Sequence, residues 1–120
     1  NSKFDVITCL EMLEHVPKPS QTLKECSELL NDKGDLFLST INRNPRSYLF
    51  AIIGAEYILN LLPKGTHDYS KFIRPSELSN WIRSANLEVK ETIGLSYNPL
   101  NETYWLGKDL GVNYLMHAKK

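Results

Sequence analysis

Short apolar runs and helix-spaced stripes alternate along the first third of the chain. Residues 4–10 form an apolar, β-branched run without clean alternation, which predicts a parallel strand covered on both faces. A helical stripe over residues 20–30, which Ser20 can cap, ends at the polar turn 31–34. Residues 36–41 form a second apolar run. Strand, helix and strand with short connections predict a right-handed βαβ unit, with ligands outside the carboxyl ends of its strands.

The second half of the chain predicts one more helix and two more strands. Pro75 suits a first helical turn, and the apolar stripe that follows it ends near Asn86. Alternating apolar positions over residues 87–97 and 112–118 predict two strands that can pair antiparallel. Between them, Asn, Pro and Gly residues over 98–111 predict a long, irregular connection. The order of these elements is typical of an α/β fold.

An unusual apolar segment lies between the two halves. Over residues 48–62 only three positions are not apolar, so a helix here would be apolar on nearly every face. At a rise of ~1.5 Å per residue this helix would be about 22 Å long, shorter than a membrane span. Arg43, Arg46 and Lys64 bracket the segment and can reach toward phosphate head groups. Two interpretations stay open: a segment that lies on a membrane or closes over a lipid-like ligand, and a buried core helix.

Composition narrows the classes of function. The 120 residues carry 14 basic and 14 acidic side chains without a basic stripe, which argues against nucleic acid as a partner. This length predicts one domain, and Cys9 and Cys26 lie in apolar-periodic segments, as reduced core thiols do. The glycines form neither a dinucleotide fingerprint nor a P-loop. The chain does not begin with methionine and shows no signal or lipidation motif, so we expect a fragment.

A polar motif follows the first predicted strand directly. If residues 11–15 are helical, Glu11, Glu14 and His15 stand at positions i, i+3 and i+4 and can share a ligand on one face. Two carboxylates and one imidazole suit a hard or borderline divalent cation. The alternative is a pair of solvated acids near a helix N-terminus, followed by a hydrogen-bonded linker histidine.

A second polar cluster spans residues 64–69. Gly65 permits an unusual backbone there, and His67 could accept or donate a proton near neutral pH, so the cluster could orient a substrate. The alternative is a plain turn in which Asp68 makes local backbone hydrogen bonds. His117 has no such neighbours in the sequence and is interpreted as structural.

Motifs along the whole chain resemble one enzyme family. Residues 4–19 read F-D-V-I-T-C-L-E-M-L-E-H-V-P-K-P, which resembles class I S-adenosylmethionine-dependent methyltransferases. It continues with S-T-I-N-R-N-P-R-S-Y-L-F, P-K-G-T-H-D-Y-S-K-F-I-R-P-S-E-L and G-L-S-Y-N-P-L, which resemble the ubiquinone biosynthesis O-methyltransferases. The resemblance implies that residues 1–120 are the C-terminal half of a doubly wound, Rossmann-like methyltransferase sheet. This half would hold strands four to seven, the last one antiparallel, with an apolar helical insertion at 46–68.

The resemblance also implies a reaction and its residues. A methyl group of S-adenosyl-L-methionine would pass to a hydroxyl of a polyprenyl catechol or demethylubiquinol. Leu10 would flank the cofactor, whose main binding half lies upstream. Glu11, Glu14 and His15 would hold a divalent cation, expected to be Mg²⁺, and His15 is a direct general base only as a second role. The substrate mouth would be formed by Asn42, Arg43, His67, Asp68 and Tyr69.

A polyprenyl substrate lives in the bilayer, so the resemblance implies a membrane role for the apolar segment. We expect peripheral association with an anionic lipid surface, on the cytoplasmic side of an inner membrane or on the matrix side in mitochondria. Other ubiquinone-pathway enzymes are expected as further partners. The expected membrane contacts are Arg46, Tyr48, Leu49, Phe50, Ile52, Ile53, Ile58, Leu61, Leu62 and Lys64.

Two other classes of protein stay open at this point. A peripheral membrane-binding module without catalysis would bind vesicles but no cofactor. A doubly wound nucleotide enzyme of another type, such as half of a dehydrogenase, would need a glycine fingerprint upstream.

Overall fold

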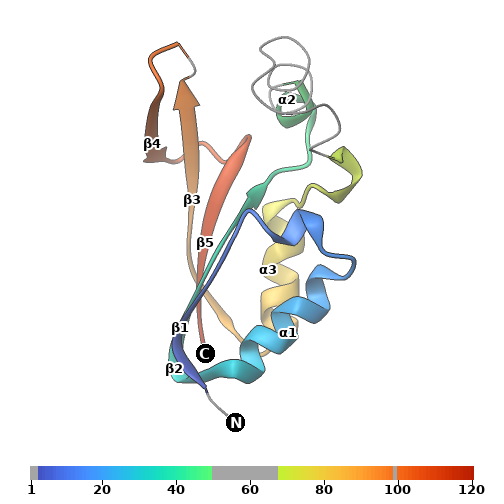
Figure 1. Ribbon diagram of the computed structural model, residues 1–120, viewed down its shortest axis with the longest axis vertical. Helices are drawn as coiled ribbons and strands as arrows, with labels where there is room; N and C mark the ends of the chain where they lie inside the picture. Colours follow the sequence, from blue (N-terminus) through green and yellow to red (C-terminus); the bar gives the residue numbers. More distant parts are fainter. Residues whose placement is uncertain (1–2, 50–67, 99) are drawn as a thin grey trace.

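A computed structural model describes residues 3–49, 68–98 and 100–120 as one mixed sheet with helices (Figure 1). The strands are β1 (Phe4–Leu10), β2 (Leu30–Ile41), β3 (Glu88–Asn98), β4 (Thr103–Gly107) and β5 (Asn113–Lys119). The helices are α1 (Pro19–Leu29), α2 (Pro45–Ser47) and α3 (Pro75–Ser84), with 3₁₀ turns η1 (Leu13–His15) and η3 (Tyr69–Lys71). None of the helices in these ranges has the length and apolar character that crossing a membrane requires.

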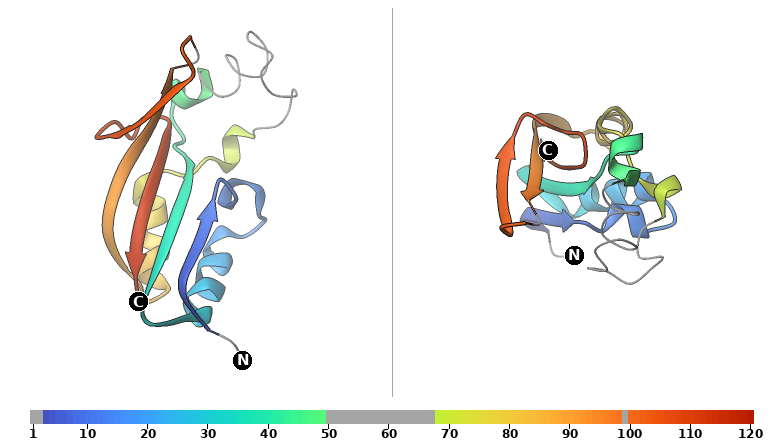
Figure 2. Two further views of the ribbon diagram at one scale, coloured as in Figure 1. Left: turned by 60° about the vertical axis from the view of Figure 1, so that its left-hand side comes forward. Right: turned by 90° about the horizontal axis from the view of Figure 1, so that it is seen from above.

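The strand order confirms the predicted βαβ unit and corrects the predicted burial of its first strand. β1 lies at the edge of the sheet, and Cys9 is its one buried residue, so this strand is not covered on both faces. The strands lie in the order β1-β2-β5-β3-β4, and the left view of Figure 2 shows β1, β2, β5 and β3 side by side. β1 and β2 are parallel, as the βαβ pattern predicts, and β5 is antiparallel to both β2 and β3. β2 begins earlier than predicted, at Leu30 directly after α1. The polar turn expected at 31–34 lies within this first part of β2, where Lys33 adopts a φ of 66°.

The strand β4 corrects the sequence-based prediction of an irregular connection. It pairs antiparallel with the end of β3, so that Leu106 lies opposite Leu95 and Trp105 opposite Ser96. All residues from Thr103 to Leu106 are exposed, so the strand carries no alternation between buried and exposed positions for a pattern to detect. The turn before it is held by Asn101, whose side chain accepts a hydrogen bond from the Thr103 N–H at 3.2 Å.

One face of the sheet carries the hydrophobic core beneath α1 and α3. Apolar side chains of the helices pack there against inward-facing side chains of the strands. The large side chains that are fully buried in this core include Leu13, Leu23, Leu36, Leu38, Leu78, Ile82, Tyr114 and Met116. Cys9 belongs to the same core, and burial raises the pKa of its thiol to about 11. Tyr114 satisfies its buried hydroxyl by donating to the Ile73 carbonyl at 2.6 Å. Packing and hydrogen bonding thus fix the strands whose ends carry the candidate site.

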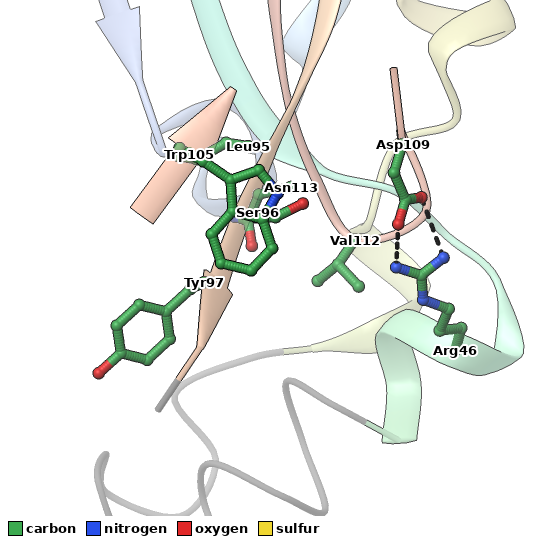
Figure 3. A pocket seen from close by; sticks show the side chains of 8 residues that line it. All are labelled: Arg46, Leu95, Ser96, Tyr97, Trp105, Asp109, Val112 and Asn113. Atoms are coloured by element: carbon green, nitrogen blue, oxygen red, sulfur yellow. Dashed lines mark hydrogen bonds and ion pairs between the residues drawn. The ribbon is translucent and has the colours of Figure 1, made fainter. Parts of the chain in front are cut away.

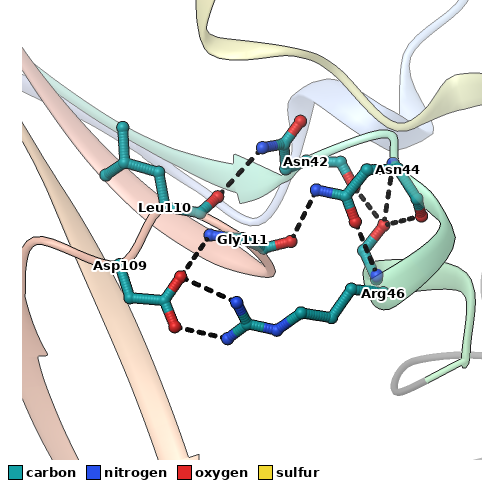
Figure 4. Close-up of polar contacts among 7 residues, drawn as sticks. Asn42, Asn44, Arg46, Asp109, Leu110 and Gly111 are labelled. Carbon is teal, nitrogen blue, oxygen red and sulfur yellow. Dashed lines mark hydrogen bonds and ion pairs between the residues drawn. The ribbon is translucent and has the colours of Figure 1, made fainter.

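A polar tether joins the start of α2 to the connection between β4 and β5 (Figure 4). Asn42 Nδ2 donates to the Leu110 carbonyl at 3.0 Å, and Asn44 Nδ2 donates to the Gly111 carbonyl at 2.9 Å. Arg46 forms an ion pair with Asp109, with Nη1 2.9 Å from Oδ1. These side chains fix the chain just before residues 50–67.

An aromatic contact joins the end of α2 to the start of η3. The rings of Tyr48 and Tyr69 meet edge to face, with centroids 5.2 Å apart. Tyr69 also contacts Phe72, which is buried beside Ile41 at the end of β2. The two positions that flank residues 50–67 are therefore neighbours in space.

Candidate active site at the carboxyl end of the parallel strands

Glu11 is the first residue after β1, and it has an unusual backbone. Its φ is 51°, a left-handed conformation that is uncommon outside glycine. The Glu11 N–H lies 3.0 Å from both the hydroxyl and the carbonyl oxygen of Ser39 in β2, which hold this bend. Its carboxylate accepts a hydrogen bond from Asn113 Nδ2 at 2.8 Å. β2 therefore holds the Glu11 backbone, and β5 holds its side chain.

Glu14 lies in η1 and is buried, with 4% of its surface exposed. Its Oε1 accepts a hydrogen bond from Thr40 Oγ1 at 3.0 Å, whereas its buried Oε2 has no donor among the described residues. Burial raises the pKa of Glu14, and hydrogen bonds with Thr40, with its own backbone and with the Glu11 side chain only partly oppose this rise. The hydrogen bond between the two side chains places the Glu11 and Glu14 carboxyl groups side by side. Neighbouring carboxyl groups favour a proton or a cation between them.

The structure brings together two of the three predicted metal ligands. Residues 11–15 are not one helix, because Glu11 lies in the left-handed region and only η1 is helical. His15 is exposed, so the predicted arrangement of three side chains on one helical face is wrong. Within residues 3–49, 68–98 and 100–120, no group of three or more His, Cys, Asp or Glu side chains is placed to hold a metal ion. The structure brings together a pair of carboxylates, Glu11 and Glu14.

The other predicted residues at this end of the sheet have mixed environments. Leu10 ends β1 with 55% of its surface exposed. Asn42 follows β2 and belongs to the polar tether. The Arg43 guanidinium donates to the Phe72 carbonyl and to Glu77 Oε2, both at 3.0 Å. Arg43 therefore links η3 and α3 to the end of β2, and its charge is already paired.

The predicted cluster at 64–69 is described only from Asp68 onward. The Asp68 carboxylate accepts hydrogen bonds from the Ser70 N–H at 3.1 Å and from the Ser70 hydroxyl at 2.7 Å, and these bonds lower its pKa. This is the local turn that the sequence left open as an alternative. His67 lies outside the described residues, as do Lys64 and the predicted membrane contacts from Phe50 to Leu62. Tyr48 and Leu49, the last described residues before them, are exposed.

Ser39, Thr40 and Asn113 are site residues that sequence reasoning missed. Ser39 holds the Glu11 backbone, Thr40 donates to Glu14, and Asn113 donates to Glu11. Ser39 and Thr40 gave a signal, because they are polar residues within a buried strand and such residues need partners. Asn113 gave none, since its contact depends on how β5 pairs with β2.

The fold and the sequence define the class of protein. Residues 1–92 match the methyltransferase domain family, and the chain belongs to this family. Its structure is similar to that of a SAM-dependent methyltransferase from Thermotoga maritima, described as a possible histamine N-methyltransferase. The TM-score is 0.67 at 18% identity, over 99% of this chain and 57% of that chain, and this likeness shows the fold.

Curated relatives confirm the narrower resemblance. The chain is 62% identical over 118 residues to the ubiquinone biosynthesis O-methyltransferase of Saccharophagus degradans, and 63% identical over 116 residues to that of Dechloromonas aromatica. These matches cover 98% and 97% of this chain but 50% of each relative. The chain thus spans about half the length of the curated relatives it matches.

Proposed function

We propose that this chain forms the acceptor side of an O-methyltransferase. It would transfer a methyl group from S-adenosyl-L-methionine to a hydroxyl of a polyprenyl catechol or demethylubiquinol intermediate in ubiquinone biosynthesis. The observation that carries the proposal is the buried Glu14 carboxylate beside Glu11, at the strand end where doubly wound sheets bind ligands. The identity with the named O-methyltransferases supports the reaction class. An upstream half would supply most of the cofactor site, with Leu10 at its edge.

Methyl transfer requires that the chain position the substrate hydroxyl and provide an acceptor for its proton. The hydroxyl oxygen attacks the methyl carbon, the C–S bond breaks, and its electron pair returns to the sulfur. The hydroxyl proton must leave, and a carboxylate with a raised pKa is a better acceptor than an ordinary one. Glu14 Oε2 suits this task because it has no donor among the described residues. Asn113 and Ser39 hold Glu11 beside it and so keep the geometry fixed.

A divalent cation fits the same two carboxylates. When bound, Mg²⁺ would lower the pKa of the substrate hydroxyl. We assign Glu11 and Glu14 as the residues that would hold it, with water and substrate oxygens completing its coordination. His15 stands apart as an exposed residue.

The test uses the completed enzyme, by which we mean this chain joined to an upstream cofactor-binding half. Transfer of a labelled methyl group to a polyprenyl catechol is measured with and without a chelator. We expect transfer in the wild type and a loss of kcat/KM of about 100-fold or more in Glu14→Gln. The matched control is Glu25→Gln, which removes an exposed carboxylate on α1 and should leave kcat/KM unchanged.

The possible outcomes distinguish the proposed methyl transfer from the proposed role of the cation. Loss of transfer with chelator, restored by Mg²⁺, supports both. Transfer that resists the chelator keeps the reaction and leaves the carboxylates as proton acceptor and orienting group. Absence of transfer in the wild type contradicts the proposed function.

The proposed enzyme works at an anionic membrane surface, because its substrate carries a polyprenyl tail. The apolar composition of residues 48–62 supports this, as does the exposure of Tyr48 and Leu49 at the start of that segment. The location follows as the cytoplasmic face of an inner membrane, or the matrix face in mitochondria.

A further inference from the structure

The strand β4 forms one edge of the sheet, and its outer side pairs with no other strand among the described residues. The right view of Figure 2 shows β4 at this outer edge, away from the helices. β1 lies at the opposite edge, so an upstream half that continues the sheet from β1 would leave β4 open. An open edge presents backbone N–H and C=O groups that can pair with a further strand.

The composition of β4 lacks the features that usually keep an edge strand unpaired. Its sequence T-Y-W-L-G contains neither a charge nor a proline, and it pairs with β3 over its whole length without a bulge. Its Thr, Tyr and Trp residues favour the extended conformation. Tyr104, Trp105 and Leu106 are 68%, 51% and 57% exposed. The strand therefore offers both unpaired backbone groups and apolar side chains to a partner.

The charges on either side of β4 favour a second copy of this chain as that partner. Glu102 precedes the strand, Lys108 follows it, and both are exposed. The two residues are equally far from Trp105 along the chain. If two copies of β4 pair antiparallel around a two-fold axis at Trp105, each Glu102 lies opposite Lys108 of the other copy. Two pairs of opposite charges then flank two uncharged strands.

The neighbouring side chains suit the same register. Tyr104 lies opposite Leu106 of the other copy on one face, and the two Trp105 side chains lie side by side on the other face. The next acidic residue, Asp109, is already paired with Arg46, whose Nη1 lies 2.9 Å from Asp109 Oδ1. Trp105 and this ion pair line opposite sides of a pocket of about 170 Å³ (Figure 3). Asp109 therefore adds no unpaired charge to the contact.

We propose that β4 pairs with β4 of a second copy, antiparallel and centred on Trp105, so that two sheets join into one. The proposal concerns assembly and does not rest on the proposed function. Two strands of five residues bury less surface than a standard protein interface, so the dimer is weak and reversible.

The test measures the dissociation constant of the dimer by sedimentation equilibrium of the completed enzyme at micromolar concentrations. Glu102→Lys places like charges opposite each other at both ends of the paired strands, and we expect it to raise the dissociation constant about tenfold. Lys108→Glu should have the same effect. The combined variant exchanges the two charges and should return the constant to its wild-type value. The control Glu25→Lys makes the same change of charge at an exposed position on α1 and should leave the constant unchanged.

A cross-linking measurement tests the register. Trp105→Cys places two thiols opposite each other across the two-fold axis, within the reach of a disulfide, so mild oxidation should join the two copies. Thr103→Cys is the control, because Thr103 lies on the same face but opposite Gly107 of the other copy, and it should not cross-link.

Three results would overturn the proposal. A wild type that stays monomeric would do so and would leave the edge to a strand of a different protein. A combined variant that dimerises no better than either single variant would remove the charge pairing. Equal cross-linking of Thr103→Cys and Trp105→Cys would exclude the register centred on Trp105.

Discussion

The Glu14 carboxylate is a buried group with an incomplete set of hydrogen bonds. Oε1 is bound by Thr40, and Oε2 has no donor within the described ranges. In Glu14→Gln the new amide can donate toward Glu11 while its oxygen keeps the Thr40 bond. Since an unsatisfied buried polar group costs ~1–3 kcal/mol, we expect the free energy of unfolding to rise by about 1 kcal/mol. Urea denaturation of the completed enzyme measures it, with Glu25→Gln as the neutral control; a fall in stability would contradict this account.

Asp35 gives the protein a predictable response to acid. His117 Nε2 and Lys119 Nζ lie 2.8 and 3.1 Å from its Oδ1, and these hydrogen bonds hold the pKa of Asp35 below its usual value. A carboxyl with a lowered pKa in the folded state stabilises the fold above its unfolded pKa, near 4, and loses this contribution as the pH falls through the folded value. The His117 ring also stacks on Phe37, with centroids 4.6 Å apart, in the structural role that the sequence predicted for it.

We therefore expect Asp35→Asn to lower the urea midpoint at pH 7, and to lower it by less near pH 3. The exposed Asp32 in the same strand provides the control, and Asp32→Asn should change neither midpoint. If Asp35→Asn lowered the urea midpoint by the same amount at pH 7 and near pH 3, the carboxylate would act through packing instead of charge.

At the scale of elements, the connection before β5 depends on one close approach to β3. A Cβ atom on Gly94 would lie 1.7 Å from the Asp109 carbonyl oxygen, so the side-chain-free residue lets this connection reach the polar tether. We expect Gly94→Ala to lower the free energy of unfolding by about 1–3 kcal/mol, because the backbone at Asp109 must move. Gly107→Ala is the control, since a Cβ there meets no atom within 4 Å. Equal denaturation curves for the two variants would contradict this prediction.

Elements whose burial follows a period could be predicted from the sequence, and those set by long-range pairing could not. The βαβ unit and the pairing of β3 with β5 follow from apolar runs and alternation. β4 is exposed along its length, and the left-handed bend at Glu11 has no signature in residue spacing. The Glu11–Asn113 contact joins residues 102 positions apart and requires the register between β2 and β5. The two acids of the site could therefore be named from the sequence, but not the residues that position them.

At the scale of the whole molecule, the candidate groups gather at one end. Glu11 follows β1, Asn42 follows β2, and α2 with the exposed Tyr48 stands at the same end (Figure 1). The membrane proposal predicts that Phe50→Glu with Ile53→Glu weakens sedimentation of the completed enzyme with anionic vesicles, because two charges would replace apolar contacts. Leu29→Glu, which alters an exposed apolar residue on α1, should sediment like the wild type. Unchanged sedimentation of the double variant would count against the membrane role.

The contact between Tyr48 and Tyr69 brings together two described positions on either side of residues 50–67. Because these two positions already meet, the entropy of closing the chain between them depends on the number of residues that separate them. That term grows slowly, by about 0.6 kcal/mol for each doubling of length. A change in the number of residues between Tyr48 and Tyr69 would therefore cost little closure entropy as long as the two rings stay in contact.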